Sequence, residues 1–122
     1  MIEKVNLADK YRKIDAAWVP RIVGDLNGQY VKIARFHGEY VWHQHAGEDE
    51  MFLVLDGGIR IHFRDGTLSL GKGEFCIVPR GVEHKPEASE PASVLLFEPA
   101  STRNTGDKDH EYTIEPGDLE RI

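Results

Sequence analysis

The chain has 122 residues, enough for one domain with a single hydrophobic core. It carries 21 acidic and 15 basic residues, and the formal charge of −6 argues against binding to nucleic acid or anionic lipid. Its longest apolar runs, about five residues, are far too short to cross a bilayer, and its first residues lack the apolar core of a signal peptide. We therefore expect a cytoplasmic protein with no nucleic-acid or membrane partner.

Turn residues recur at short intervals along the chain, and the segments between them alternate with period two or are short and rich in β-formers. Segment 7–18 is compatible with a short helix or an edge strand, and 24–29 is predicted to be a turn. The predicted strands are 30–36, 40–45, 51–55, 59–63, 67–70, 74–79 and 92–99. A polar loop is expected before the last strand, and a further short strand could lie at 112–114.

Seven or eight short strands without a useful helical period predict an all-β sandwich or barrel. We expect one domain over residues 1–122 with its barrel core at about 30–100. Segment 1–19 would add an N-terminal strand or short helix, and 101–122 an irregular tail. Cys76, the only cysteine, lies in an apolar run and is expected to be a buried, inert thiol.

The stretch "WHQHAGEDEMFLVLDGG" places ionisable side chains where a core would otherwise be apolar. Side chains two apart on a strand share a face, so His43 and His45 point together. Trp42 and Gln44 then point to the opposite side. Glu50 follows a turn and begins the next strand, where its carboxylate can return to the level of the two rings. Such a buried group is costly unless it is coordinated, which favours a divalent metal over a metal-free hydrogen-bonded cluster.

A third nitrogen donor is expected from the stretch "GKGEFCIVPRGVEHKPEA". Pro79 fixes φ and Gly81 permits a positive φ, so "PRG" can form a sharp, stiff bend that holds His84 in place. The other three histidines are expected at the surface, because polar groups generally prefer solvent. They are His37, His62 and His110.

These residues together resemble a small single-domain cupin. The first family motif is matched by Gly38, His43, His45, Glu50 and Gly57, and the second by Gly73, Pro79, Gly81 and His84. Two departures occur: four residues separate Gly38 from His43 where five are usual, and Ala88 stands where the second motif ends in asparagine. Neither departure touches a metal ligand.

The resemblance implies a cupin-type jelly-roll β-barrel (a double-stranded β-helix), a metal near the barrel mouth, and a homodimer. The implied ligands are His43, His45, Glu50 and His84. Such a site suits one divalent transition metal ion, namely Fe, Mn, Ni, Co, Cu or Zn. The exposed edges and apolar strands of a short all-β chain also favour a homodimer.

The ligand set predicts a metalloenzyme of the dioxygenase, lyase or isomerase type that acts on a small polar organic molecule. A non-catalytic small-molecule or metal-binding module is the alternative, and no catalytic residue is assigned. The basic residues are scattered, which weakens a phosphate-binding role: Lys32, Arg35, Arg60 and Arg80. Candidates for the pocket wall are Phe52, Phe75, Phe97 and Tyr30, and for proton carriers Tyr30, Tyr40 and Glu39.

Overall fold

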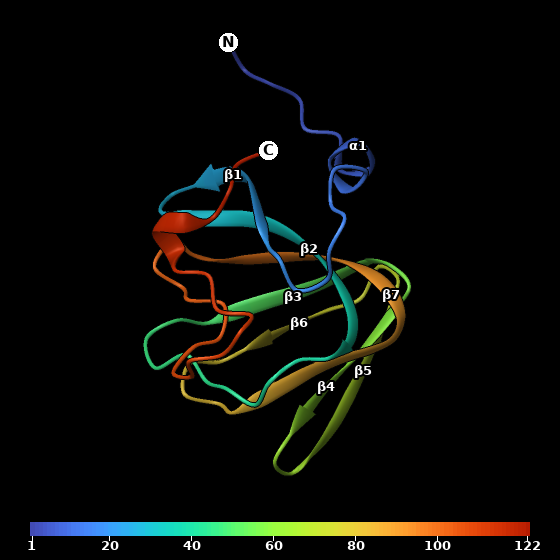
Figure 1. Ribbon diagram of the computed structural model, residues 1–122, viewed down its shortest axis with the longest axis vertical. Helices are drawn as coiled ribbons and strands as arrows, with labels where there is room; N and C mark the ends of the chain where they lie inside the picture. Colours follow the sequence, from blue (N-terminus) through green and yellow to red (C-terminus); the bar gives the residue numbers. More distant parts are fainter.

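The computed structural model describes residues 1–122, and nearly all of its regular structure is β-sheet (Figure 1). The strands are β1 (Arg21–Leu26), β2 (Gln29–Glu39), β3 (Glu50–Asp56), β4 (Gly58–Phe63), β5 (Gly66–Gly71), β6 (Phe75–Val78) and β7 (His84–Pro99). A short helix, α1 (Leu7–Tyr11), precedes them, and a 3-10 turn, η1 (Pro116–Asp118), follows. Neither has the length and apolar character that crossing a membrane requires. The fold is the predicted all-β jelly roll.

The longest strand, β7, joins the two parts of the barrel. Its first residues pair with β4, and its second half lies between β2 and β3. The strand bends at 89–91, because Ala88 pairs with Gly38 and Ala92 pairs with Phe36, which leaves the intervening residues unmatched on β2. The polar loop expected before the last strand is therefore limited to 79–83, and the strand begins at His84 rather than at Ala92, where the sequence had predicted its start. The backbone of β7 pairs on both sides of the bend, while the polar side chains at the bend face outward. The polar composition of this part of the sequence therefore did not indicate a strand.

The barrel interior holds the main hydrophobic core, a cluster of 13 buried residues. Alternate residues of each strand supply it: Phe52 and Val54 of β3 are buried, and their neighbours Met51, Leu53 and Leu55 are half-buried. A second, smaller cluster lies on the outer face, where Tyr11 and Ile14 pack on Ile33. This cluster attaches the N-terminal segment to the sheet.

Segment 40–45 is extended but is not a regular strand, contrary to the sequence prediction. It makes one isolated bridge, in which His43 and His84 exchange backbone hydrogen bonds of 3.0 and 2.9 Å. Pro86 lies opposite this segment and has no N–H to donate, so the regular hydrogen-bond pairing between β2 and β7 does not continue past it. The bridge is enough to hold the two histidine-bearing segments side by side.

Both ends of the chain lie at the same end of the barrel (Figure 1). Within 7–18 the structure has the short helix rather than an edge strand. The segment after β7 runs across the front of the strands (Figure 1). Residues 112–114 do not form the predicted strand, because the Ile114 N–H donates to the Asn104 side chain instead of to the backbone of a neighbouring strand.

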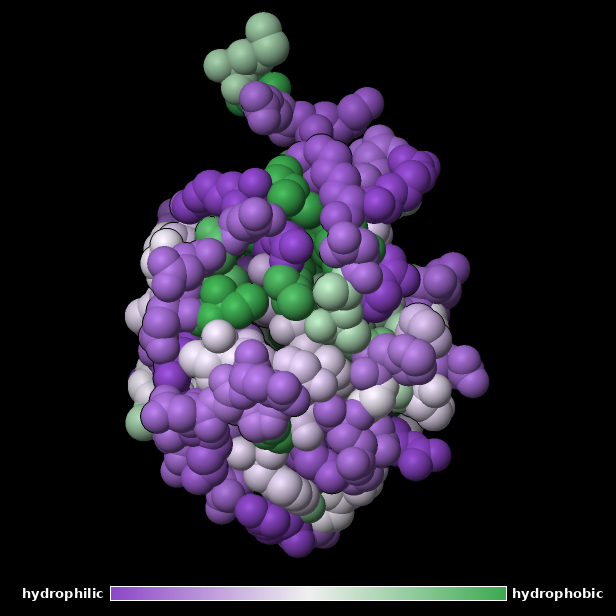
Figure 2. All heavy atoms as spheres, in the orientation of Figure 1, coloured by the Kyte–Doolittle hydropathy of each residue, from purple (hydrophilic) through white to green (hydrophobic).

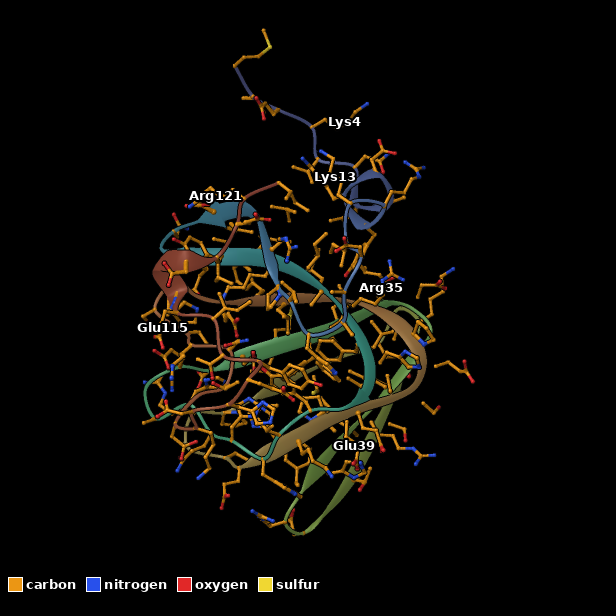
Figure 3. All side chains as sticks on the ribbon, in the orientation of Figure 1. Lys4, Lys13, Arg35, Glu39, Glu115 and Arg121 are labelled. Atoms are coloured by element: carbon orange, nitrogen blue, oxygen red, sulfur yellow. The ribbon has the colours of Figure 1, made fainter.

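The surface of this view is mostly hydrophilic, with hydrophobic atoms gathered between α1 and the C-terminal segment (Figure 2). Charged side chains such as Glu115 and Arg121 lie at the edge of the molecule in this view (Figure 3).

Candidate metal centre

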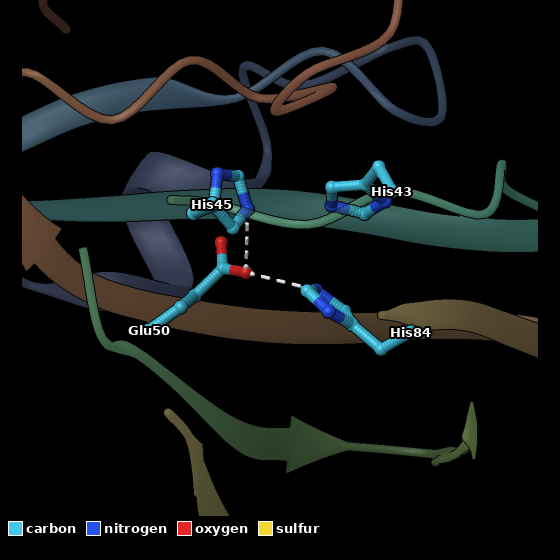
Figure 4. Close-up of side chains that lie close together, drawn as sticks. All are labelled: His43, His45, Glu50 and His84. Carbon is cyan, nitrogen blue, oxygen red and sulfur yellow. Dashed lines mark ion pairs between the residues drawn. The ribbon is translucent and has the colours of Figure 1, made fainter. Parts of the chain in front are cut away.

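Four side chains from three parts of the chain meet inside the barrel (Figure 4). His43 and His45 come from the segment after β2. Glu50 begins β3, and His84 begins β7. All four are buried, and one potential ligand atom from each lies within 4.8 Å of the others. The structure thus brings together the four residues that the sequence had grouped.

Backbone carbonyl groups orient two of the imidazole rings. His43 Nδ1 lies 2.9 Å from the Val41 carbonyl oxygen, and His84 Nδ1 lies 2.9 Å from that of Val82. Because a carbonyl oxygen only accepts, each Nδ1 carries the proton, and Nε2 keeps its lone pair. The free lone pairs are then available to a cation, as in metal sites where the second ring nitrogen is hydrogen-bonded.

Three buried atoms at the centre of the cluster have no hydrogen-bond partner: His45 Nε2, His84 Nε2 and Glu50 Oε1. The two nitrogens lie 3.2 and 3.3 Å from the carboxylate oxygen. Each buried polar atom left unpaired costs about 1–3 kcal/mol. A divalent cation between these atoms would satisfy all of them, since imidazole nitrogen and carboxylate oxygen are common transition-metal ligands. The residues present therefore fit a metal ion.

The "PRG" bend holds the cluster from one side. Gly81 has a φ of +80°, which an L side chain rarely adopts, and its N–H donates to the His45 carbonyl oxygen over 2.8 Å. The Arg80 N–H donates to Asp49 Oδ1 over 2.9 Å. Two acids of "EDE" thus have separate roles, because Asp49 fastens the bend while Glu50 enters the centre.

Burial and neighbouring charges set the protonation of the cluster. Burial, together with the nearby His84 ring, lowers the pKa of His43 to about 4, so this ring is neutral and ready to coordinate. Burial opposes ionisation of Glu50, but the adjacent Glu98 carboxyl and the His45 and His84 rings outweigh it and hold the Glu50 pKa well below its usual range. A neutral imidazole beside an ionised carboxylate is the state that a metal requires.

A cavity of about 30 Å³ borders the cluster at His43 and Glu50. Its aromatic wall consists of Trp18, Phe36, Tyr40 and Phe52. The Tyr40 ring lies 4.7 Å from that of Trp18 and 5.6 Å from that of Tyr112, so N-terminal and C-terminal segments both contribute to a stack beside the centre.

Of the four wall residues expected from the sequence, only Phe52 borders this cavity. Phe75 was placed wrongly, because it is 58% exposed on the outer face. Phe97 and Tyr30 are half-buried and do not border the cavity. Among the candidate proton carriers, Tyr40 borders the cavity, whereas Glu39 is exposed and pairs with Lys85.

The sequence analysis missed Glu98, a second buried carboxyl at the centre. Lys32, which had been counted among the scattered basic residues, is also buried, and its Nζ donates to Glu98 Oε1 over 2.9 Å. While no cation offsets the charge of Glu50, burial and that charge raise the Glu98 pKa well above its usual range, against the opposing effect of Lys32. The signal was present: on β7, period two puts Glu98 on the same face as the core residues Val94 and Leu96.

The C-terminal segment packs against the histidine-bearing segment. Asp107 N–H donates to the Gln44 carbonyl oxygen, and Gln44 N–H donates back to Asp107 Oδ1, each over 3.1 Å. Gly106 has a φ of +57°, and a Cβ there would overlap the Gln44 backbone oxygen and lie 3.2 Å from His43 Cδ2. The segment can reach the centre only with glycine at this position.

Gly106→Ala is therefore expected to destabilise the fold by about 2–4 kcal/mol, from a strained φ and from overpacking. Urea unfolding measures the change in free energy. Gly117→Ala is the matched control in the same segment, since nothing lies within 4 Å of a Cβ there and its φ is not positive. Equal stability of the two variants would contradict the close packing described for Gly106.

The remaining singled-out residues lie away from the centre. His37 and His110 are exposed, as expected. His62 is half-buried rather than at the open surface, because it bridges Thr67 Oγ1 and Glu87 Oε1 over 2.9 and 2.8 Å. Cys76 is also half-buried, and burial raises its pKa to about 11, which keeps the thiol protonated and unreactive at neutral pH.

Comparison with known proteins gives three useful relatives. The chain is 38% identical over 64 residues to the uncharacterised protein YdbB of Bacillus subtilis, covering 52% of this chain and 57% of that one. It is 43% identical over 47 residues to acireductone dioxygenase of Rhodopseudomonas palustris (strain TIE-1), covering 35% of this chain and 28% of that enzyme. The crystal structure of a cupin-2 domain containing protein from Shewanella frigidimarina superimposes with a TM-score of 0.77 at 40% identity, covering 78% and 93% of the two chains.

A jelly-roll barrel with a buried cluster of histidine and glutamate at its centre defines the class of protein. The sequence model of the family described as "Cupin domain" matches residues 32–98, more than half of the chain. The chain belongs to the cupin family. The matched region spans only 57% and 28% of the two curated relatives.

Proposed function

We propose that this cupin holds one divalent transition metal ion with His43, His45, Glu50 and His84 and acts as a metalloenzyme on a small polar organic molecule. The observation that carries the proposal is the convergence of three buried, unpartnered ligand atoms on one point. A protein that left them unpaired would lose stability without compensation.

The bound ion would act as a Lewis acid or bind an oxidant beside the substrate, because four protein ligands leave positions open on a six-coordinate ion. The chain's own residues orient the rings, exclude water with an aromatic wall and admit ligand from the cavity beside Glu50. The local identity to acireductone dioxygenase supports a dioxygenase as the first activity to test, with a lyase and an isomerase next. We expect the protein to work in the cytoplasm.

The test starts from metal analysis of the purified chain. Protein loaded with Fe(II) or Ni(II) is then titrated spectroscopically with oxo acids, catechols and sugars, and turnover is measured under air and under nitrogen. Product formation that requires air selects a dioxygenase, and equal conversion under nitrogen selects a lyase or isomerase. Failure to bind any of these metals with four ligands would overturn the proposal.

A non-catalytic binding module is the second candidate, and the size of the cavity favours it. A volume of about 30 Å³ has room for only one or two water molecules, so a larger substrate would need the aromatic wall to move. Spectral perturbation by a ligand without turnover under either atmosphere would select this module over an enzyme.

We also propose a homodimer formed through the outer face of the sheet. A row of apolar side chains crosses four strands there, from Val31 to Phe97, Met51 and Ile77 in register. Ile77 is 58% exposed, and Phe75, two residues before it on the same face, is equally exposed. A contiguous apolar surface of this kind is typical of an interface.

Ile77→Glu is expected to convert the dimer to a folded monomer, because a second copy would bury the new charge at the interface. Sedimentation velocity at micromolar concentration measures the change in mass. Leu68→Glu is the control, since Leu68 is also exposed (40%) but lies on β5, outside the row. A wild-type chain that sediments as a monomer would refute this assembly.

A further inference from the structure

A second carboxyl group lies beside the metal centre and is not among its candidate ligands. Glu98 is 2% exposed and borders the same cavity as His43 and Glu50. Its Oε1 accepts a hydrogen bond from Lys32, whereas its Oε2 is buried with no hydrogen bond inside the protein. One oxygen is thus fixed, and the other is available to a molecule that enters the cavity.

Most other polar groups of the cavity are already committed. Asn104 donates its Nδ2–H to the Tyr112 carbonyl oxygen over 2.8 Å and accepts at Oδ1 from the Ile114 N–H over 2.9 Å. His43 directs its Nδ1–H to the Val41 carbonyl group. The rest of the wall is largely aromatic or aliphatic. Apart from the Tyr40 hydroxyl, the free oxygen of Glu98 is therefore the hydrogen-bonding group outside the candidate metal ligands that a second polar group of a ligand would meet.

The buried pair is difficult to explain by stability alone. Lys32 and Glu98 are both almost fully buried, and desolvation of two charges usually cancels most of their attraction. Apolar residues at the same inward positions would serve the core at least as well. A ligand contact gives the pair a role, since Lys32 holds the carboxyl in a fixed orientation at the edge of the cavity.

We propose that Glu98 is a substrate-binding residue that accepts a hydrogen bond from a hydroxyl group of the ligand, while a neighbouring carbonyl oxygen of the same ligand occupies an open position on the metal. This inference rests on the proposed function and specifies its substrate class as small hydroxycarbonyl compounds. The cavity of about 30 Å³ holds only one or two water molecules, so the two oxygen groups must be close together, and the aromatic wall must move to admit the rest of the ligand. Two neighbouring carboxyl groups, Glu50 and Glu98, disfavour a phosphate or carboxylate ligand at this position.

The test uses full-length protein loaded with Co(II), whose visible absorption reports ligand binding without turnover. Hydroxyacetone and methoxyacetone are titrated under nitrogen, because they share the carbonyl oxygen but only the first can donate a hydrogen bond. The wild-type protein is expected to bind hydroxyacetone about ten-fold more tightly than methoxyacetone. In Glu98→Gln, which presents an amide N–H₂ to the cavity in place of an acceptor, this preference is expected to disappear.

Glu87→Gln is the matched control, because Glu87 lies on the same strand but pairs with His62 away from the cavity, and it should keep the preference. Cobalt content is measured for every variant. A preference that survives in Glu98→Gln, or equal binding of the two ketones by the wild type, overturns the inference and leaves the metal centre intact. A loss of cobalt in Glu98→Gln also overturns it, by assigning Glu98 to support of the metal. A wild-type chain that takes up no cobalt overturns the proposed function itself.

Discussion

His84→Ala is expected to lower the affinity for a divalent metal by about ten-fold or more, because even partners outside the ligand set change metal affinity by roughly 10- to 100-fold. His84 is fully buried, with Nδ1 held by the Val82 carbonyl group and Nε2 directed at Glu50. Its loss leaves three candidate ligands and a hole in the wall of the site. Metal content per chain after dialysis against limiting metal measures the effect.

The same variant gives a second readout, through stability. A ligand that binds only the folded state stabilises it in proportion to the logarithm of its concentration over Kd. Added metal should therefore raise the Tm of the wild type clearly more than that of His84→Ala. His62→Ala is the control, because the His62 side chain is tied to Thr67 and Glu87 and is not one of the four clustered residues. If His84→Ala keeps full metal content, His84 is not a ligand.

Glu98→Leu is expected to destabilise the fold by about 3–5 kcal/mol, because it leaves the buried Lys32 ammonium without its partner. The double variant Lys32→Met with Glu98→Leu removes both charges and should recover most of the loss, since a buried ion pair adds little over apolar residues of similar volume. Urea unfolding of the wild type, both single variants and the double variant gives the coupling energy directly.

A surface pair supplies the comparison. Arg121 and Asp25 form an ion pair with more than half of each side chain exposed, so Asp25→Asn should change stability little. If the double variant is as unstable as Glu98→Leu, the pair is needed for folding. Recovery in the double variant would instead show that stability alone does not account for the pair, as the substrate-binding role of Glu98 requires.

The direction of each clustered side chain was predictable from the sequence because neighbouring residues set it. Strand periodicity fixes the common direction of His43 and His45, and a short turn returns Glu50 to their level. The proline and glycine before His84 predict the bend that the structure shows, in which Gly81 has a positive φ. Each inference needs only the residues near one turn, together with the assumption that apolar strands pair.

The surroundings of the cluster were less predictable because distant segments build them. Trp18 reaches the cavity from the N-terminal segment, and Asn104 reaches it from the segment after β7. Neither position carries a periodic signal, since both segments are irregular and their backbone groups bond to side chains or to other strands. The same irregularity led to the wrong strand at 112–114. The strand predicted at 40–45 does not form because Pro86, in the opposite segment, has no N–H to donate.

By itself, the sequence determined the all-β class, most strand positions and the identity of the four clustered side chains, because alternation and turn residues act over a few neighbours. Only the tertiary structure decided that Lys32 and Glu98 form a buried pair beside the cluster, although 66 positions separate them in the chain. It also decided that Gly106 packs against the backbone of Gln44. Such contacts depend on strand register and on the path of the chain ends, which no local pattern encodes.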